Sequence, residues 1–244
     1  MRSVRRLLVL SLLAAAPAAS ADLLEGQVGG AVGASTSYVF RGLTESDSSP
    51  SVQADVHYYL NSGAFAGLWA ATVKRNYGDS TTGEFNLYLG YAWPLASSWD
   101  AKLVYVHYDY PWNQPHRSYA YDELSATVGY DGRVYLSVSA SPDTPADTSR
   151  GSVAGRAALA YDLALHQPLP WALSVNAGVG YYDLRWVAGT GYVYWNAGLG
   201  YALGPVQLDL SYIGTNGVAR RLFYPGVADE FAVRRLVATA IWRF

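Results

Sequence analysis

The residues of this chain best suited to chemistry are four histidines, His57, His107, His116 and His166. No two of them have the i, i+4 spacing of a zinc-binding helix, and the chain has no cysteine, so we expect no metal and no cofactor. The sequence also contains no G-x-S-x-G motif and no phosphate-binding loop. A hydrolase would still be possible if the fold brought a serine and an acid to His57 or His107. Because the sequence shows no such motif, we predict that the protein is not an enzyme.

A second set of polar side chains falls on one face of otherwise apolar, alternating segments. Its members are Asp55, His57, Asn86, Lys102, Arg156, Asn176, Asn196 and Asp209. The alternation puts Asp55, Arg156 and Asp209 near mid-height of the segments, with His57 and Lys102 lower. Enclosed charges need partners or water. We therefore interpret the set as pore-lining residues of a wet constriction; a salt-bridged, plugged lumen is the alternative.

These side chains need strands to position them, and the sequence alternates between apolar and small or polar residues along most of its length. We predict twelve strands, long enough to cross a bilayer at a tilt. Their ranges are 27–40, 51–60, 64–74, 84–93, 98–110, 120–130, 133–140, 152–163, 171–182, 191–202, 206–213 and 231–244. The connections alternate between six long polar ones and five short ones, as in an outer-membrane barrel with short periplasmic turns.

The alternation also predicts which side chains face outward. In the third strand we expect this of Phe65, Trp69, Ala71 and Val73. In the fifth, outward odd positions would place Val104 and Val106 inside with Lys102. In the eleventh, Leu208 should face lipid and Asp209 the lumen. Aromatic residues near strand ends fit an interfacial girdle: Phe40, Tyr91, Trp93, Tyr130, Trp171, Tyr201 and Trp242. The inward tyrosines either line a path for stacking solutes or fill the bore: Tyr88, Tyr135, Tyr182 and Tyr194.

The N-terminus has the form of a secretory signal peptide. Three arginines precede the apolar run 7–16, and Ala19-Ser-Ala21 forms a small-x-small cleavage site, so we predict a signal peptide at 1–21 and a mature barrel at 22–244. Without the signal arginines, 14 basic residues stand against 19 acidic ones, a net charge of −5, which argues against a nucleic-acid partner. Only 15% of residues are charged, which is low for a soluble domain.

The chain ends in Ile241-Trp-Arg-Phe244 on the last alternating segment. A terminal aromatic residue there resembles the sorting signal of bacterial outer-membrane barrels, so we expect the barrel-assembly machinery to be a partner, with outer-membrane lipid and small polar solutes as the others. An even number of strands places both termini in the periplasm.

Three stretches resemble a bacterial family of porin-like outer-membrane proteins, the TorF or Gcw_chp family. They are 37–47 (SYVFRGLTESD) with Pro50 and Val52-Gln53, then 84–91 (EFNLYLGY) and 192–201 (YVYWNAGLGY). The resemblance implies an antiparallel transmembrane β-barrel in the outer membrane and supplies no catalytic residues. Our hypothesis is a porin for passive diffusion of small hydrophilic solutes through a narrow lumen. The alternatives are an outer-membrane enzyme of the lipid-hydrolase type and a plugged structural or adhesive barrel.

Overall fold

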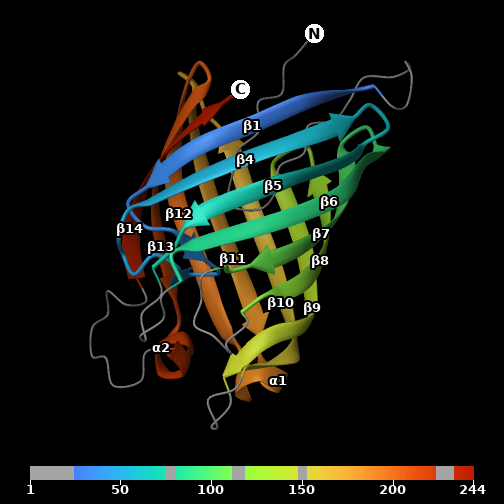
Figure 1. The fold of residues 1–244 in the computed structure, drawn as a ribbon. Helices are drawn as coiled ribbons and strands as arrows, with labels where there is room; N and C mark the ends of the chain where they lie inside the picture. Colours follow the sequence, from blue (N-terminus) through green and yellow to red (C-terminus); the bar gives the residue numbers. More distant parts are fainter. Residues whose placement is uncertain (1–24, 75–80, 112–118, 148–152, 224–233) are drawn as a thin grey trace.

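The computed structural model describes residues 25–74, 81–111, 119–147, 153–223 and 234–244. Within these ranges, twelve antiparallel strands close into one barrel, in the order β1, then β14 down to β4 (Figure 1). The strands are β1 Gly26–Ser35, β4 Ser51–Leu60, β5 Ala64–Thr72, β6 Gly83–Ala96, β7 Trp99–Asp109, β8 Tyr121–Tyr130, β9 Val134–Asp147, β10 Val153–Pro168, β11 Leu173–Asp183, β12 Tyr192–Leu203, β13 Val206–Thr215 and β14 Arg234–Arg243. The predicted all-β antiparallel barrel is confirmed. The predicted signal peptide lies outside the described residues.

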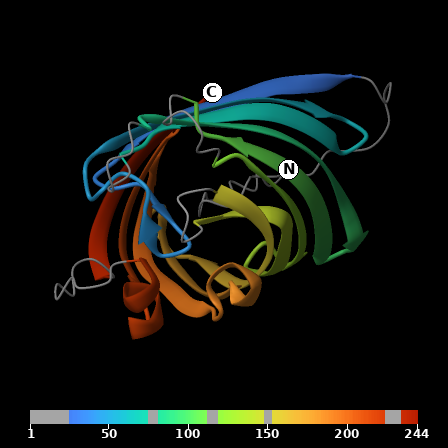
Figure 2. The same ribbon diagram turned by 60° about the horizontal axis from the view of Figure 1, so that its bottom comes forward.

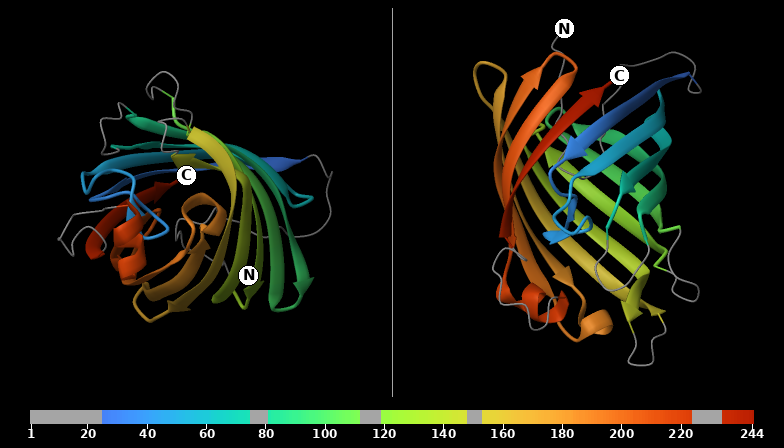
Figure 3. Two further views of the ribbon diagram at one scale, coloured as in Figure 1. Left: turned by 90° about the horizontal axis from the view of Figure 1, so that it is seen from below. Right: turned by 60° about the vertical axis from the view of Figure 1, so that its left-hand side comes forward.

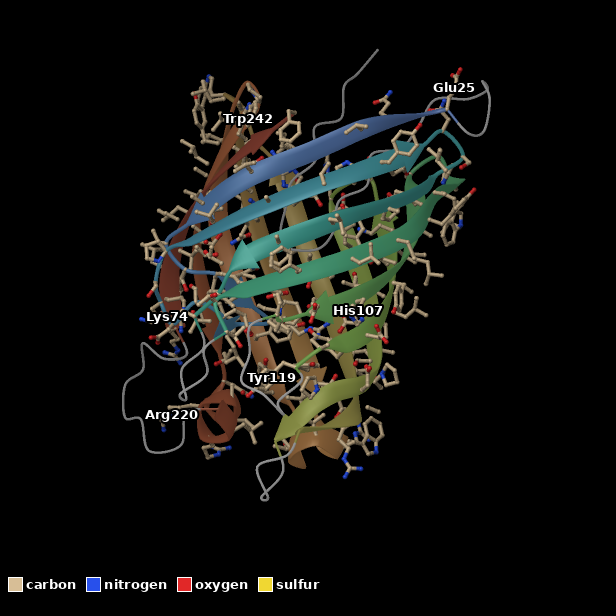
Figure 4. All side chains as sticks on the ribbon, viewed as in Figure 1. Glu25, Lys74, His107, Tyr119, Arg220 and Trp242 are labelled. Atoms are coloured by element: carbon tan, nitrogen blue, oxygen red, sulfur yellow. The ribbon has the colours of Figure 1, made fainter. Side chains whose placement is uncertain are left out.

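The two ends of the barrel differ in their connections. One end, here the turn end, carries the short connections 61–63, 97–98, 131–133, 169–172 and 204–205. Glu25 and Trp242 lie at this end, and Arg220 lies at the opposite one, here the loop end (Figure 4). Two short helices, α1 Arg185–Ala188 and α2 Gly217–Phe223, belong to the connections of the loop end. No helix in the described ranges is long and apolar enough to span a membrane.

The alternation of faces follows the sequence in most strands. Leu208 exposes 44% of its surface on the outside. In β7, Val104 and Val106 are buried in the lumen and Leu103 is exposed, so the predicted phase is confirmed. Aromatic side chains form an outer ring at the turn end, where Trp99 and Tyr130 pack with ring centroids 4.8 Å apart.

The predicted outward face of β5 is wrong. Phe65, Ala71 and Val73 are buried at 5–6% exposure, whereas Leu68 is 57% exposed. The reason is the content of the lumen. Phe65 packs inside with Tyr59 and Tyr88, so the larger residues of β5 have an apolar environment on the inner side as well.

Two predicted boundaries are also wrong. β1 ends at Ser35 rather than at Phe40, and Phe40 lies inside the barrel rather than in the outer girdle. The predicted loop 141–151 is largely strand, because β9 continues to Asp147. β9 accommodates Pro142 where the register with β10 shifts between Arg156 and Ala158, whereas Pro145 stays in register with Gly155. A proline cannot donate to a ladder, and such irregular positions tolerate it.

Candidate functional site

The segment between β1 and β4 forms a small hairpin that lies inside the ring of strands (Figures 2 and 3). Its strands are β2 Val39–Phe40 and β3 Leu43–Thr44, and the Glu45 backbone N–H closes it on the Tyr38 carbonyl at 2.9 Å. We call residues 38–45 the inserted hairpin. Arg41 and Gly42 form its two-residue turn with φ of 47° and 81°. Two positive φ values are typical of a type I′ turn, which fits the twist of a tight hairpin.

Arg41 places a guanidinium inside the lumen, between side chains of β8 and β11. Its Nη2 donates to both carboxylate oxygens of Glu123 on β8, at 2.9 and 2.8 Å. The rings of Phe40 and Tyr182 lie 4.7 and 4.4 Å from the guanidinium carbon. The side chains of Arg41 and Glu123 are only 7% and 5% exposed. Burial opposes the charged form, but the Glu123 carboxylate raises the pKa of Arg41 well above its ordinary value, so the guanidinium remains charged.

The tip of the inserted hairpin is fitted against the wall formed by β12 and β13. The Tyr192 hydroxyl donates to the Arg41 carbonyl at 3.1 Å. A Cβ atom added to Gly42 would lie 2.5 Å from Thr215 Cγ2 and 2.7 Å from Tyr194 Cβ. Only glycine therefore satisfies both the positive φ and the close approach at this position.

The base of the hairpin is anchored to the opposite side of the barrel. Tyr38 is 2% exposed, and its hydroxyl donates to Glu84 Oε1 on β6 at 3.3 Å. Asn86 Nδ2 donates to the same oxygen at 2.8 Å. The rings of Tyr38 and Trp69 lie 5.4 Å apart. Phe40 packs on an aromatic cluster of β5 to β8 and Leu43 on a cluster of β10 to β12, so the hairpin bridges the two sides of the lumen.

The predicted pore-lining residues do not form one ring. Asp55 accepts hydrogen bonds from the Tyr88 hydroxyl at 2.6 Å and pairs with His57 Nδ1 at 2.6 Å. Asp209 accepts from Gln207 at 2.9 Å. Arg156 is exposed, three residues after the start of β10 and near the loop end, and the structure does not bring it to either carboxylate.

The other predicted pore-lining residues are distributed along the inner wall. Asn86 contacts Glu84, and Asn176 accepts from His166 Nδ1 at 2.8 Å. Asn196 on β12 is in register with Gly178, and Lys102 on β7 is in register with Thr127. Several of the predicted pore-lining residues therefore belong to small local networks rather than to one ring.

Sequence reasoning missed Arg41 and Glu123. Arg41-Gly42 between alternating residues is a signal for a two-residue hairpin, but the pattern also fits a strand that ends at Phe40. Glu123 lies on the inward face of its strand, as the alternation predicts, yet nothing in the sequence indicates its partner.

A histidine–carboxylate pair lies on the outer face of the barrel (Figure 4). His107 Nδ1 lies 2.7 Å from Asp122 Oδ1, and the Tyr105 hydroxyl donates to the same oxygen at 2.6 Å. His57 and His166 contact Asp55 and Asn176, so no described histidine hydrogen-bonds a serine. His116 lies outside the described residues. The arrangement in the described part of the chain therefore does not assemble a serine nucleophile on an imidazole.

The closed barrel, with an apolar outer face and a lumen that holds both polar and aromatic side chains, defines a porin-like β-barrel. Among solved structures, the chain is similar to one described as a NanC porin in a rhombohedral crystal form, with 8% identity, a TM-score of 0.57, and coverage of 88% of this chain and 98% of that one. A second, from work on in-meso crystallization of membrane proteins, has 10% identity, a TM-score of 0.53, and coverage of 88% and 83%. These likenesses show the fold.

The family follows from the sequence. Residues 19–240 match the family described as a bacterial protein of unknown function (Gcw_chp), and the chain belongs to it. A comparison with curated proteins found no match.

Proposed function

We propose that this protein is an outer-membrane channel for passive diffusion of small hydrophilic solutes, narrowed in its loop half by the inserted hairpin. The support comes from the contrast between the apolar outer face and the polar groups on the inner face of the barrel wall. Outward side chains such as Leu208 and Leu210 are apolar and 44–47% exposed, which suits contact with lipid. Inward groups in the turn half, such as Asp55 and His57, keep 19% and 28% of their side chains exposed. Partly exposed polar groups inside a barrel support a wet lumen.

The proposal includes an orientation. The short turns and both described ends of the chain would face the periplasm, and the long connections would face outward. Phe244 is 59% exposed on the outer face, and its backbone N–H and C=O each hydrogen-bond Gly30 at 3.1 Å. The last residue thus closes the barrel and remains available on its surface, which supports recognition of the C-terminal strand by the barrel-assembly machinery.

The observation that carries the functional proposal is the partly exposed polar lining of the lumen at Asp55 and His57. The Arg41–Glu123 pair, which reaches from the hairpin tip to the wall, would set the selectivity of the channel. A solute must pass beside a fixed guanidinium and a fixed carboxylate in a region of low dielectric constant, where charges act strongly. Because the pair is neutral as a unit, we expect weak selectivity between small anions and cations. Passage would be limited mainly by size.

The rival function is a plugged barrel without transport. The near-complete burial of Arg41 and Glu123 and the ring on each side of the guanidinium favour it. A hairpin held this firmly would have to move before a solute could pass. The two functions differ in whether the native barrel conducts at all.

Planar-bilayer recordings decide between them. We expect the refolded wild type to conduct, and we expect a variant with residues 37–48 replaced by a short glycine–serine linker to conduct more. The matched control is Arg156→Ala, which removes an exposed arginine from the same end and should leave conductance unchanged. A silent wild type beside a conducting linker variant would overturn diffusion in favour of the plug. Heat-dependent migration on a detergent gel confirms folding of every variant, because a closed barrel resists detergent until it is heated.

A further inference from the structure

The lumen opens at the turn end into a cavity of about 670 Å³, within the size range of small-molecule sites. The connections 169–172 and 204–205 border it. Four polar side chains line it: His166, Ser174, Gln207 and Arg243. We call this cavity the vestibule. It lies at the end opposite the long connections, and none of its lining residues belongs to the inserted hairpin.

Arg243 in the vestibule is incompletely satisfied. Its Nη1 donates to Gln207 Oε1 at 3.3 Å, but its enclosed Nε and Nη2 have no hydrogen-bond partner among the described residues. A guanidinium has five N–H donors in a planar fork that matches a carboxylate. Arg243 therefore has two donors without a partner beside a cavity large enough for a ligand. Both donors are enclosed, so the side chain would have to turn toward the cavity to use them.

One oxygen of the nearby Asp209 carboxylate lacks a hydrogen-bond donor among the described residues. Asp209 Oδ1 accepts from Gln207 Nε2 at 2.9 Å, whereas the enclosed Asp209 Oδ2 has no partner among the described residues. Gln207 thus contacts both charged groups, and the two are not within ion-pair distance of each other in the structure. A Cβ atom added to Gly200 would lie 2.5 Å from Ser174 Oγ and 2.8 Å from Asp209 Oδ1. The hydroxyl and the carboxylate therefore lie close to the same point of the backbone.

We propose that the vestibule binds small zwitterionic solutes of the amino-acid type. The solute carboxylate would accept from Arg243. Its ammonium group would reach Asp209 past Ser174 and Gln207, because Asp209 lies behind these two residues and does not itself line the vestibule. Unpaired groups of opposite sign side by side complement a ligand that carries both charges, and a simple anion would meet repulsion from Asp209. The inference deepens the proposed diffusion function, on which it rests for its biological role, by naming a solute class for the same lumen.

Three probes of similar size test the assignment. Alanine carries both charges, propionate only the carboxylate and ethylamine only the ammonium group. Binding is measured by saturation-transfer NMR on the full barrel in detergent micelles at neutral pH. We expect saturable, weak binding of alanine, because a site on a diffusion path must also release its solute. Propionate and ethylamine should each bind at least about tenfold more weakly, because each loses one charge-assisted hydrogen-bond set.

The variants localise the site. Arg243→Gln should weaken alanine binding at least about tenfold. Asp209→Asn should weaken alanine and leave propionate unchanged or strengthened. Arg243→Lys keeps the charge without the fork, and it provides the test if the glutamine variant does not fold. The control is Arg133→Gln, which removes an exposed arginine from the same end outside the vestibule and should change nothing.

Equal binding of alanine and propionate, or an alanine affinity that none of the vestibule variants changes, would overturn the proposal. Because the measurement requires no ion flow, the site and the channel can fail independently. A silent barrel that still binds alanine would overturn diffusion and keep the site. A conducting barrel that does not bind alanine would overturn the site and keep diffusion.

Discussion

Two arginines inside the same barrel have opposite surroundings. In the loop half, Arg41 makes two hydrogen bonds to one carboxylate and lies between two aromatic rings. In the turn half, Arg243 has one long hydrogen bond, to a neutral amide. The first arrangement uses the charge to hold a loop in place, because a buried charge that is paired and stacked gains most from staying where it is. The second leaves two enclosed donors without a hydrogen-bond partner among the described residues.

The strongest test of this contrast is Glu123→Leu. The substitution leaves the buried Arg41 charge unpaired, which costs about 3–5 kcal/mol. We expect the loss to appear in the docking of the inserted hairpin. Hydrogen exchange of the Glu45 amide, which donates to the Tyr38 carbonyl across the hairpin, should therefore become faster, while the amides of the wall strands keep their protection.

An exposed ion pair at the same end gives the control. Lys74 and Asp47 lie 3.4 Å apart with side-chain exposures of 63% and 30%, and Lys74→Ala should cost about 0–1 kcal/mol. Equal effects of the two substitutions would mean that Arg41 and Glu123 do not anchor the hairpin.

The next test separates the two faces of the wall in the turn half. Leu208→Arg puts a charge on the lipid-facing side two residues from the start of β13, and at this depth, between the interface and the midplane, it should cost about 1–2 kcal/mol. Asp209→Asn changes a luminal side chain and should cost less. Reversible folding into lipid vesicles with denaturant measures both. The opposite order would mean that the faces of β13 are exchanged, because a one-residue shift exchanges them.

Substitutions at two glycines with positive φ test the packing of the hairpin tip: Gly42 in the hairpin and Gly204 in an open turn. A side chain in the left-handed region costs about 1–2 kcal/mol, and both Gly42→Ala and Gly204→Ala should show this loss. Gly42→Ala should lose more, because its Cβ would meet Thr215 and Tyr194, whereas no atom lies within 4 Å at Gly204. Equal losses in thermal unfolding of the two variants would show that the hairpin tip does not press on the wall.

The smallest effect is expected at Arg156. The sequence pattern places it at mid-height between two carboxylates, where its removal would move selectivity toward cations. The structure places it exposed near the start of β10. Arg156→Ala should therefore change stability by less than about 0.5 kcal/mol and leave the reversal potential in a salt gradient unchanged. A clear cation shift would restore the mid-height ring.

The sequence by itself determined the architecture. Period-two alternation with apolar positions on one side requires strands with one buried face. In a membrane, such strands can hydrogen-bond all their backbone N–H and C=O groups only if the sheet closes into a barrel. The twelve strands, the alternation of short and long connections, and the outward position of Leu208 all follow from it. The phase of β7 does not follow from it, because Val104 and Val106 share a face with Lys102 and both faces of the strand carry apolar residues.

Only the tertiary structure decided what fills the lumen. Alternation tells which residues share a face, but apolar residues identify the outer face only if the inner face is polar. At Phe65 the inner face is not polar, because aromatic side chains surround this residue inside the lumen. The pairing of Arg41 with Glu123 joins residues 82 positions apart, which no local pattern encodes. The same holds for the neighbouring unpaired groups of Arg243 and Asp209, because their relation depends on the register of β13 and β14 and on the cavity that closure of the barrel creates.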